Sequence, residues 1–237
     1  MTVSAIVTAK GIPLYIGTAL DSLLAQTRQP DEVIISLDGS PDQTMEFVAR
    51  RLTDAGYPIP WRLIQSSRPQ GTAETRNAGI MAAKGDILAF LDGDDWYLPD
   101  KIFRSENAVL HGINFLATFS GFYYLHEKGK VEKANPWNPL PEDQYKSLEK
   151  ECFPMTNSVF LKKAFEEIGL FNPKYEMAED YDWWERYLQK HTVHMIPDPL
   201  FVYRRHRSAK VEDGYIRANK ERAEIQERVR RNLNAIS

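Results

Sequence analysis

The sequence lacks the features that mark secreted, membrane-spanning and nucleic-acid-binding proteins. Its 237 residues include one cysteine, Cys152, so an internal disulfide is excluded and a reducing compartment is the expected setting. No stretch approaches the roughly 20 apolar residues of a membrane-spanning helix, and residues 1–15 do not read as a signal peptide. The net charge of −3 gives no indication of general nucleic-acid binding. We therefore expect a soluble, cytoplasmic protein, which could still lie peripherally at the inner face of the membrane.

Familiar phosphate-binding and nucleophile motifs are missing as well. The chain contains neither GxGxxG nor GxxxxGK[ST], so a bound nucleotide would need a metal ion and side chains around its phosphates. The acidic stretch at 92–95 does not continue into the ligand pattern of an EF-hand loop. No surrounding pattern supports Cys152 as a nucleophile, and an ordinary packing role is expected for it.

What the first hundred residues do contain is a regular alternation of strand and helix patterns. Short apolar runs and helical spacing predict the following order: strand 4–9, helix 15–26, strand 32–38, helix 42–56, strand 61–67, helix 72–85 and strand 86–92. This alternation indicates an α/β fold with a mostly parallel central sheet flanked by helices. Such sheets bind ligands beyond the carboxyl ends of their strands.

The pattern changes after residue 100. A helix at 99–112, two strands within 113–135 that turn at 127–130, an irregular proline-rich loop at 134–144, a strand and short helix within 155–171, and helices at 178–190 and 213–237 are predicted. With 43% apolar residues, the chain can bury a sizeable core, and one domain over 1–237 is expected.

The strand predicted at 86–92 ends in "LDGDD", which places three carboxylates next to one another. Asp92 and Asp94 at such an end can reach the same point, and hard divalent cations such as Mg²⁺ or Mn²⁺ bind carboxylates together with substrate phosphates. Gly93 would let the backbone bend and a ligand approach closely. Asp95 could join the metal site or cap the next segment. The alternative is a polar turn before the helix that follows Pro99.

Longer stretches resemble a known family. The segments "VSAIVTA", "EVIISLDGSPDQT", "RPQGTAETRNAGIMAAKGDILAFLDGDDWYLPDKI", "AEDYDWWERYL" and "VYRRHRSAK" resemble family 2 glycosyltransferases of GT-A fold. The likeness runs continuously over roughly residues 3–104 and returns in patches to about 210. It implies a nucleotide-sugar-binding half at 1–100, an acceptor-binding half at 101–212 and a C-terminal helix at 213–237.

The resemblance implies roles for four positions near the nucleotide. Thr8 and Ala9 end the first strand where the family contacts the nucleoside. Asp38 matches the second aspartate of the family's "DDGS" and would accept a hydrogen bond from the base, whereas Leu37 replaces the first aspartate. Arg76 matches the arginine of the family's "ARN" and would lie near the nucleotide.

The resemblance also implies where the chemistry takes place. Asp92 and Asp94 match the DXD metal-binding motif, and Gly93 between them would lie against the donor. Asp180 matches the family's catalytic base, and His206 matches a histidine near the donor diphosphate. The implied reaction is an inverting, metal-assisted sugar transfer.

Each position has a structural alternative. Asp38 could cap a turn, Arg76 could be an exposed helix charge, and Asp180 could be the N-cap of its helix, with Glu179 as the rival base. His206 could be a surface histidine. Of the adjacent Trp183 and Trp184, one is expected in the core while the other could stack on a sugar.

The donor and acceptor are less defined than the reaction. A UDP-sugar is the default donor because UDP is the commonest nucleotide in the family, with a hexosyl or N-acetylhexosaminyl group transferred. A glycan or lipid-linked acceptor, as in polysaccharide biosynthesis, would fit. The rival functions are a nucleotidyltransferase, disfavoured because "TAKGIPLY" offers few triphosphate-binding residues, and a non-catalytic binding protein of the same fold.

The final helix at 213–237 carries six basic and four acidic residues. Its arginines could contact anionic lipid head groups. Its acidic residues favour an ordinary solvated face or a homodimer contact instead. Comparing vesicle binding of the full chain with that of residues 1–212 would separate these possibilities.

Overall fold

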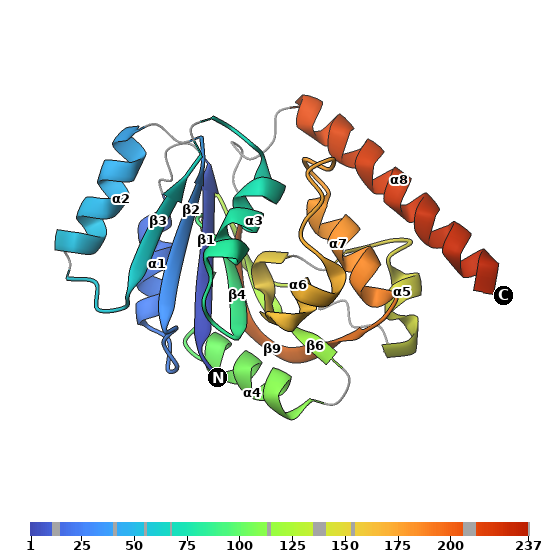
Figure 1. Cartoon of the computed structure of the whole chain (residues 1–237), viewed down its shortest axis with the longest axis horizontal. Helices are drawn as coiled ribbons and strands as arrows, with labels where there is room; N and C mark the ends of the chain where they lie inside the picture. The colour runs from blue at the N-terminus through green and yellow to red at the C-terminus, as the bar shows by residue number, and fades with distance from the viewer. Residues whose placement is uncertain are drawn as a thin grey trace.

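Figure 1 shows the computed structural model, in which one curved sheet carries helices on both sides. The structure describes residues 1–10, 15–39, 42–54, 56–66, 68–112, 115–134, 141–152, 155–205 and 212–236. Within these ranges the strands are β1 (Val3–Lys10), β2 (Glu32–Asp38), β3 (Trp61–Gln65), β4 (Ile87–Asp92), β5 (Trp96–Tyr97), β6 (Phe115–His126), β7 (Val131–Lys133), β8 (Ser158–Leu161) and β9 (Thr192–Arg205).

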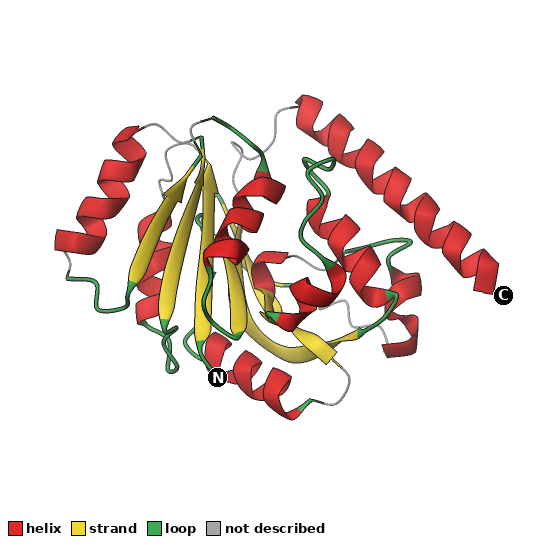
Figure 2. Cartoon of the chain, viewed as in Figure 1, coloured by secondary structure: helices red, strands yellow, loops and turns green. Residues whose placement is uncertain are grey.

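The helices alternate with these strands in the first part of the chain, and Figure 2 shows helices on both sides of the sheet. They are α1 (Ile16–Leu24), α2 (Asp42–Asp54), α3 (Thr72–Ala82), α4 (Lys101–His111), α5 (Gln144–Ser147), α6 (Lys163–Ile168), α7 (Glu179–Leu188) and α8 (Glu212–Ile236), with short 3₁₀ turns η1 (Pro141–Asp143) and η2 (Met155–Asn157). Every helix and strand that the sequence pattern predicted has a counterpart here, shifted by a few residues at its ends.

The parallel half of the sheet brings the predicted strand ends together. The strand order is β3-β2-β1-β4, with all three pairings parallel. The residues of β1 and β4 are almost all buried, as expected for strands covered on both faces. In the register, Thr8 lies beside Asp92 and Lys10 beside Asp38, so the carboxyl ends of three strands meet at one edge.

The second half of the sheet is mixed rather than parallel. β8 runs antiparallel to both β4 and β6, and the long strand β9 runs parallel to β6. The sequence pattern assigns no element to residues 191–212, whereas the observed strand β9 contains Pro197 and Pro199, a residue type that is rare inside strands. The structure accommodates them with register shifts around Gly121, where an added Cβ would lie 2.8 Å from the carbonyl oxygen of Pro197.

A buried lysine connects this half of the sheet to the strand-end edge. Lys101 Nζ donates to the carbonyl and side-chain oxygens of Asn157 (2.6 and 2.9 Å) and to Ser120 Oγ (3.0 Å). Burial lowers the pKa of Lys101 well below its ordinary value. The next residue back, Thr156, accepts a hydrogen bond from the amide of Asp92 (2.8 Å) through its Oγ1. Lys101 therefore helps to fix the turn that supports Asp92.

Both tryptophans of α7 belong to the core. Trp183 and Trp184 are fully buried, and Trp183 packs against Phe165 and Phe160 with ring centroids 4.7 and 5.1 Å apart. The expectation that one of them could stack on a sugar is therefore wrong. The reason is that α7 is covered on several sides, by α3, α5, α6, α8 and β9.

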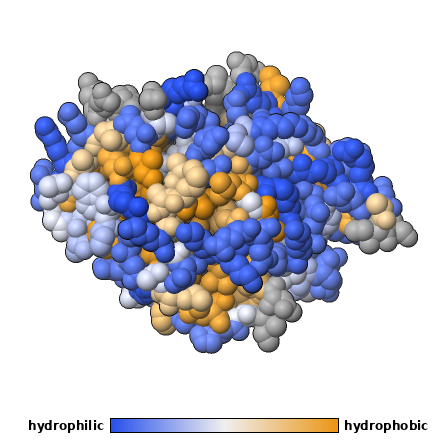
Figure 3. Space-filling view, in the orientation of Figure 1, coloured by the Kyte–Doolittle hydropathy of each residue, from blue (hydrophilic) through white to orange (hydrophobic). Residues whose placement is uncertain are grey.

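The C-terminal helix α8 packs along α7 and α5 through a stripe of buried residues, Ala218, Ile225 and Val229. Arg228 of α8 donates to the buried carboxylates of Asp182 (2.8 Å) and Glu185 (2.9 Å). The surface over α8 is mostly hydrophilic in Figure 3. Among the described residues, no helix combines the length and apolar character needed to cross a bilayer.

Candidate active site

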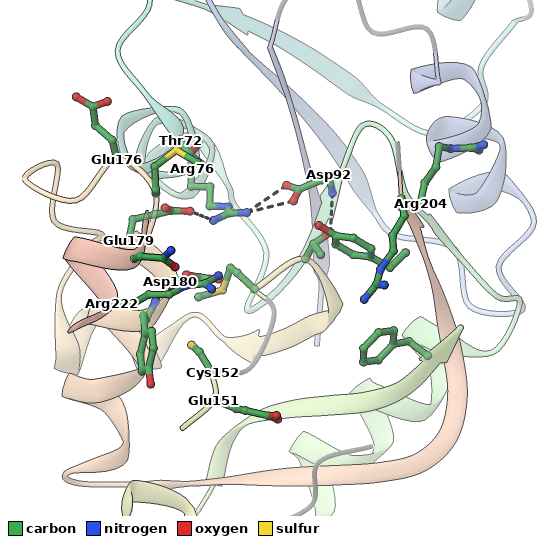
Figure 4. A pocket seen from close by; sticks show the side chains of 18 of the residues that line it. Thr72, Arg76, Asp92, Glu151, Cys152, Glu176, Glu179, Asp180, Arg204 and Arg222 are labelled. Carbon is green, nitrogen blue, oxygen red and sulfur yellow. Dashed lines mark hydrogen bonds and ion pairs between the residues drawn. The ribbon is translucent and has the colours of Figure 1, made fainter. Parts of the chain in front are cut away.

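A cleft of about 1000 Å³ opens beside the carboxyl end of β4. Its walls come from segments far apart in the chain: the end of β4, the start of α3, residues 150–152 and 155–156, the start of α7, the end of β9 and one side of α8 (Figure 4). Such a volume is at the upper end of the range typical of ligand sites.

Asp92, at the end of β4, is held by three neighbours. Its Oδ1 accepts a hydrogen bond from Thr8 Oγ1 (2.6 Å), and both carboxylate oxygens accept from Arg76 Nη2 (3.2 and 3.3 Å). Its amide donates to Thr156, as described above. The side chain is about one-third exposed and lines the cleft. Asp92 is thus oriented from β1, α3 and η2 at once.

Arg76 is a buried bridge between the two acidic sides of the cleft. Its guanidinium forms an ion pair with Glu179 at the start of α7 and another with Asp92 (Figure 4). Arg76 is 4% exposed, so the alternative of an exposed helix charge is wrong. Burial raises the pKa of Glu179 to about 7; the Arg76 charge opposes this rise, and neighbouring Asp180 adds to it.

Asp180 follows Glu179 in the first turn of α7 and lines the cleft. The N-cap position of α7 is occupied by Ala178, so Asp180 is not the N-cap residue. Its side chain is half-buried. Burial raises the pKa of Asp180, whereas the positive charges of Arg76 and Arg222 act in the opposite direction. A partly desolvated carboxylate of this kind has the properties of a general base.

In the acidic tip, residues 92–95, Asp92 lines the cleft, whereas Asp94 and Asp95 do not. Asp95 is 2% exposed and accepts the backbone amide of Arg204 (2.8 Å). Burial, together with Asp94 and Asp92, raises the pKa of Asp95 well above its ordinary value. Arg204 Nε donates to the carbonyl of Asp94 (3.0 Å), and the Asp94 side chain is half-buried. Asp95 therefore fastens the tip to β9.

The donor set at this tip suits a hard divalent cation. Within the described part of the chain, no group of three or more His, Cys, Asp or Glu side chains could hold a metal ion. Mg²⁺ and Mn²⁺ are commonly held by one or two carboxylates, with substrate phosphates and water supplying the other oxygens. Asp92 and Asp94 meet that requirement in chemistry, although Arg76 already occupies part of the Asp92 carboxylate.

Asp38 does not line the cleft. Its Oδ1 accepts the amides of Gln70 (2.6 Å) and Gly71 (3.2 Å), and Lys10 Nζ lies 3.4 Å from its Oδ2. The carboxylate therefore ties the end of β2 to the segment before α3. Its predicted contact with the base stays a prediction.

The remaining residues predicted at the nucleotide lie at the edge of the site or outside it. Thr8 is buried against Asp92, and Ala9 is half-buried behind it. The amide of Gly93 donates to the carbonyl of Thr8 (2.8 Å), and a Cβ on Gly93 would lie 3.1 Å from Ala9 Cβ. Gly93 thus allows the tip to pack tightly on β1. His206 lies outside the described residues.

Several cleft residues have no counterpart in the sequence prediction. From α8 come Asn219, Arg222 and Gln226, and from β9 come Tyr203, Arg204 and Arg205. The spacing i, i+3, i+7 of the three α8 residues could have marked a single helical face. The sequence of β9 gives no comparable indication that its last residues line a cleft. Cys152, predicted as a packing residue, is half-buried and lines the cleft.

Comparison with known proteins agrees with this architecture. The family model described as "Glycosyl transferase family 2" matches residues 4–169. An uncharacterized glycosyltransferase of Haemophilus influenzae is 29% identical over 192 residues, which cover 76% of this chain and 60% of that protein. EpsJ of Bacillus subtilis, an uncharacterized glycosyltransferase, is 28% identical over 229 residues, covering 90% of this chain and 64% of that protein. The chain thus spans less than two thirds of either relative.

Solved structures show the same fold at low sequence identity. S. aureus TarS in complex with UDP-GlcNAc superposes with a TM-score of 0.67 at 17% identity, covering 92% of this chain and 64% of that one. The mannosyltransferase PcManGT from Pyrobaculum calidifontis, in complex with GDP-Man and Mn²⁺, gives 0.64 at 20% identity, covering 85% and 56%. The family match spans more than half of the sequence, and the chain therefore belongs to glycosyl transferase family 2 and has the GT-A fold.

Proposed function

We propose that the protein transfers a sugar from a nucleoside-diphosphate sugar to an acceptor hydroxyl, with inversion at the anomeric carbon. The observation that carries this proposal is the arrangement of Asp92 and Asp180 on one cleft, connected through the buried Arg76–Glu179 ion pair. A strand-end carboxylate and a desolvated carboxylate at a helix start supply the two groups that such a displacement needs.

The donor class is supported by the relatives. TarS was solved with UDP and UDP-GlcNAc, and PcManGT with GDP-Man and Mn²⁺. We propose a UDP-sugar as the donor, carrying a hexosyl or N-acetylhexosaminyl group. The base would lie beyond the ends of β1 and β2, where Thr8, Ala9 and Asp38 are located.

Asp92 and Asp94 would hold a divalent cation together with the donor diphosphate, and Gly93 between them lets the backbone pack closely against Ala9 of β1. The cation would supply positive charge that stabilises the departing diphosphate without proton transfer. Arg76 keeps the Asp92 carboxylate oriented and adds fixed positive charge behind it. His206 is proposed to approach the same diphosphate.

Asp180 is the proposed base. It would accept the proton of the acceptor hydroxyl as the oxygen–carbon bond forms, while the bond from the anomeric carbon to the diphosphate oxygen breaks on the opposite face. A positioned base contributes typically about 10²–10⁴-fold. Glu179 is the less suitable base because it is buried and paired with Arg76.

The acceptor is proposed to be a glycan or a lipid-linked saccharide, as in polysaccharide biosynthesis. A peripheral membrane contact and a homodimer remain predictions. The packing of α8 on α7 and α5 accounts for the apolar side of that helix.

A panel of nucleotide sugars with Mn²⁺ or Mg²⁺ tests the proposal. Release of a nucleoside diphosphate, in the presence of acceptor extracts or by slow donor hydrolysis, is the expected result. Chelation with EDTA should reduce it, and Asp180→Asn should reduce turnover without weakening donor binding.

Other outcomes identify the rivals. Pyrophosphate as the product would indicate a nucleotidyltransferase. Binding of a nucleotide sugar with no product from any donor would indicate a non-catalytic protein of this fold. Joint replacement of Asp92 and Asp94 by asparagine with undiminished sugar transfer would contradict the assigned metal site.

A further inference from the structure

One side of α8 faces the cleft with polar side chains. Asn219, Arg222 and Gln226 all line it and are spaced i, i+3 and i+7, so they share one helical face. This cleft-facing stripe lies next to the buried apolar stripe that attaches α8 to α7. The helix therefore has a packing side and a separate side that is open to a ligand.

The cleft-facing stripe is fixed relative to the proposed base. Glu221 of α8 accepts the amides of Met177 (2.9 Å) and Ala178 (3.1 Å), which immediately precede α7. Arg228 is paired with buried carboxylates further along α7. These contacts hold α8 against the turn that carries Asp180, and Figure 4 shows Arg222 beside Asp180.

Arg222 differs from the other arginines of α8 that contact neighbouring segments. Arg217 pairs with Glu176, Arg228 with Asp182, and Arg230 lies near Glu149 and Glu227. Arg222, by contrast, is exposed and forms no hydrogen bond or ion pair with any residue that the structure describes. Its guanidinium therefore retains its donors for a ligand in the cleft.

A second cation lines the same cleft. Lys150 follows α5, is exposed, and its side chain makes no ion pair within the described ranges. The cleft is also lined by Arg204 and Arg205 and by the carboxylates of Glu151 and Asp180, so charges of both signs face it. A guanidinium suits bidentate binding of a carboxylate or phosphate, whereas an ammonium acts as a point charge.

We propose that the cleft-facing stripe of α8 forms part of the acceptor site, and that Arg222 binds a phosphate or carboxylate group of the acceptor. This rests on the proposed sugar transfer and specifies its acceptor as an anionic saccharide, such as a sugar phosphate or a uronic acid. Asn219 and Gln226 would hydrogen-bond neutral hydroxyls on either side of the anionic group.

Binding of matched probes tests the proposal directly. With the protein saturated with UDP and Mn²⁺, calorimetry would compare N-acetylglucosamine 1-phosphate with methyl N-acetylglucosaminide, and methyl glucuronide with methyl glucoside. The charged member of at least one pair should bind about 10- to 100-fold more tightly, as expected for hydrogen bonds to a charged group. The two pairs distinguish a phosphate-bearing acceptor from a carboxylate-bearing one.

Arg222→Gln should remove this preference and leave binding of the neutral probes unchanged. The matched control is Arg231→Gln, because Arg231 is exposed on the same helix, has no described ion-pair partner and does not line the cleft. The control should retain the preference.

The outcomes separate this proposal from the function on which it rests. Equal binding of charged and neutral probes, or an undiminished preference in Arg222→Gln, would overturn the acceptor assignment even if the protein releases nucleoside diphosphate from a donor. Lack of nucleoside diphosphate release from every donor would instead count against sugar transfer.

A purely electrostatic effect of Arg222 on Asp180 predicts a different result. It would change turnover equally for charged and neutral acceptors and shift the pH profile of both. A rise in KM confined to the charged acceptor is the result that supports binding.

Discussion

On the strand-end wall of the cleft, formed by the end of β4 and the start of α3, the Asp92 carboxylate accepts hydrogen bonds from Thr8 and Arg76. On the helical wall, formed by residues 150–152, the start of α7 and α8, Asp180 depends on charges contributed from α3 and α8. The chemistry of the strand-end wall comes from a short motif that the sheet holds in place. The residues of the helical wall, by contrast, come together only through tertiary packing. Substitutions in the two walls should therefore change different properties of the protein.

The largest expected effect is on turnover, from Asp180→Asn on the helical wall. Removing a positioned base should lower kcat by about 10²–10⁴-fold, while the donor dissociation constant stays unchanged because the strand-end wall is intact. Steady-state kinetics and donor titration would measure both. Glu179→Gln is the neighbouring control, and a greater loss of kcat there than in Asp180→Asn would transfer the role of base to Glu179.

Arg76→Gln should produce the largest loss of stability, because Arg76 connects the two walls. The change leaves Glu179 buried without its cationic partner, and breaking a buried ion pair typically costs about 3–5 kcal/mol. Urea unfolding would measure the loss. In the double variant Arg76→Gln/Glu179→Gln no unpaired charge remains at position 179, so part of the lost stability should return. If the losses of the two single variants simply add in the double variant, Arg76 and Glu179 do not stabilise each other.

A smaller effect should appear in the pH dependence of stability. Burial raises the pKa of Glu179 from 4.5 to about 7 despite Arg76. Between these values the folded chain binds more protons at Glu179 than the unfolded chain, so the free energy of unfolding should fall as pH rises. At about 1.4 kcal/mol per pKa unit, the total is at most about 3.5 kcal/mol.

Urea midpoints of the wild type and Glu179→Gln between pH 4.5 and 8 would reveal this contribution. The wild type should lose stability relative to the variant as pH rises through this window. Parallel curves would mean that Arg76 fully offsets the burial of Glu179.

The smallest expected effect is at the rim of the helical wall. Arg217 and Glu176 form an ion pair in which both side chains are more than half exposed. Exposed pairs contribute about 0.2–1 kcal/mol, so Arg217→Gln should lower the free energy of unfolding by no more than that and leave donor binding unchanged. A loss as large as that of Arg76→Gln would show that α8 is held at its rim rather than at Arg228.

The strand-end wall could be predicted from sequence because its information is local. A buried apolar run followed by Asp92, Gly93 and Asp94 indicates both the strand and the chemistry at its end. The alternation of strands and helices up to residue 100 then places such ends at one edge. The resemblance to the GT-A family added the fold of the second half, which the comparisons confirm.

The helical wall could not be predicted from the sequence in the same way. That Arg76 is a buried bridge depends on Glu179, 103 residues away, and the sequence pattern allowed an exposed helix charge equally well. The two tryptophans of α7 are both buried because several elements meet there, which helical spacing alone does not reveal. β9 was missed because its prolines are tolerated only through bulges opposite Gly121.

Because Glu221 and Arg228 fasten the last helix to the turn bearing Asp180, a chain shortened to residues 1–212 would lose more than a candidate lipid-adhesive surface. It would also lose the Arg228 charge that pairs with Asp182 and Glu185, and the hydrogen bonds from the segment before α7 to Glu221. Vesicle experiments on this protein are better done by neutralising the exposed Lys220 and Arg231, which should weaken any binding to anionic lipid while leaving the packing of α8 on α7 intact.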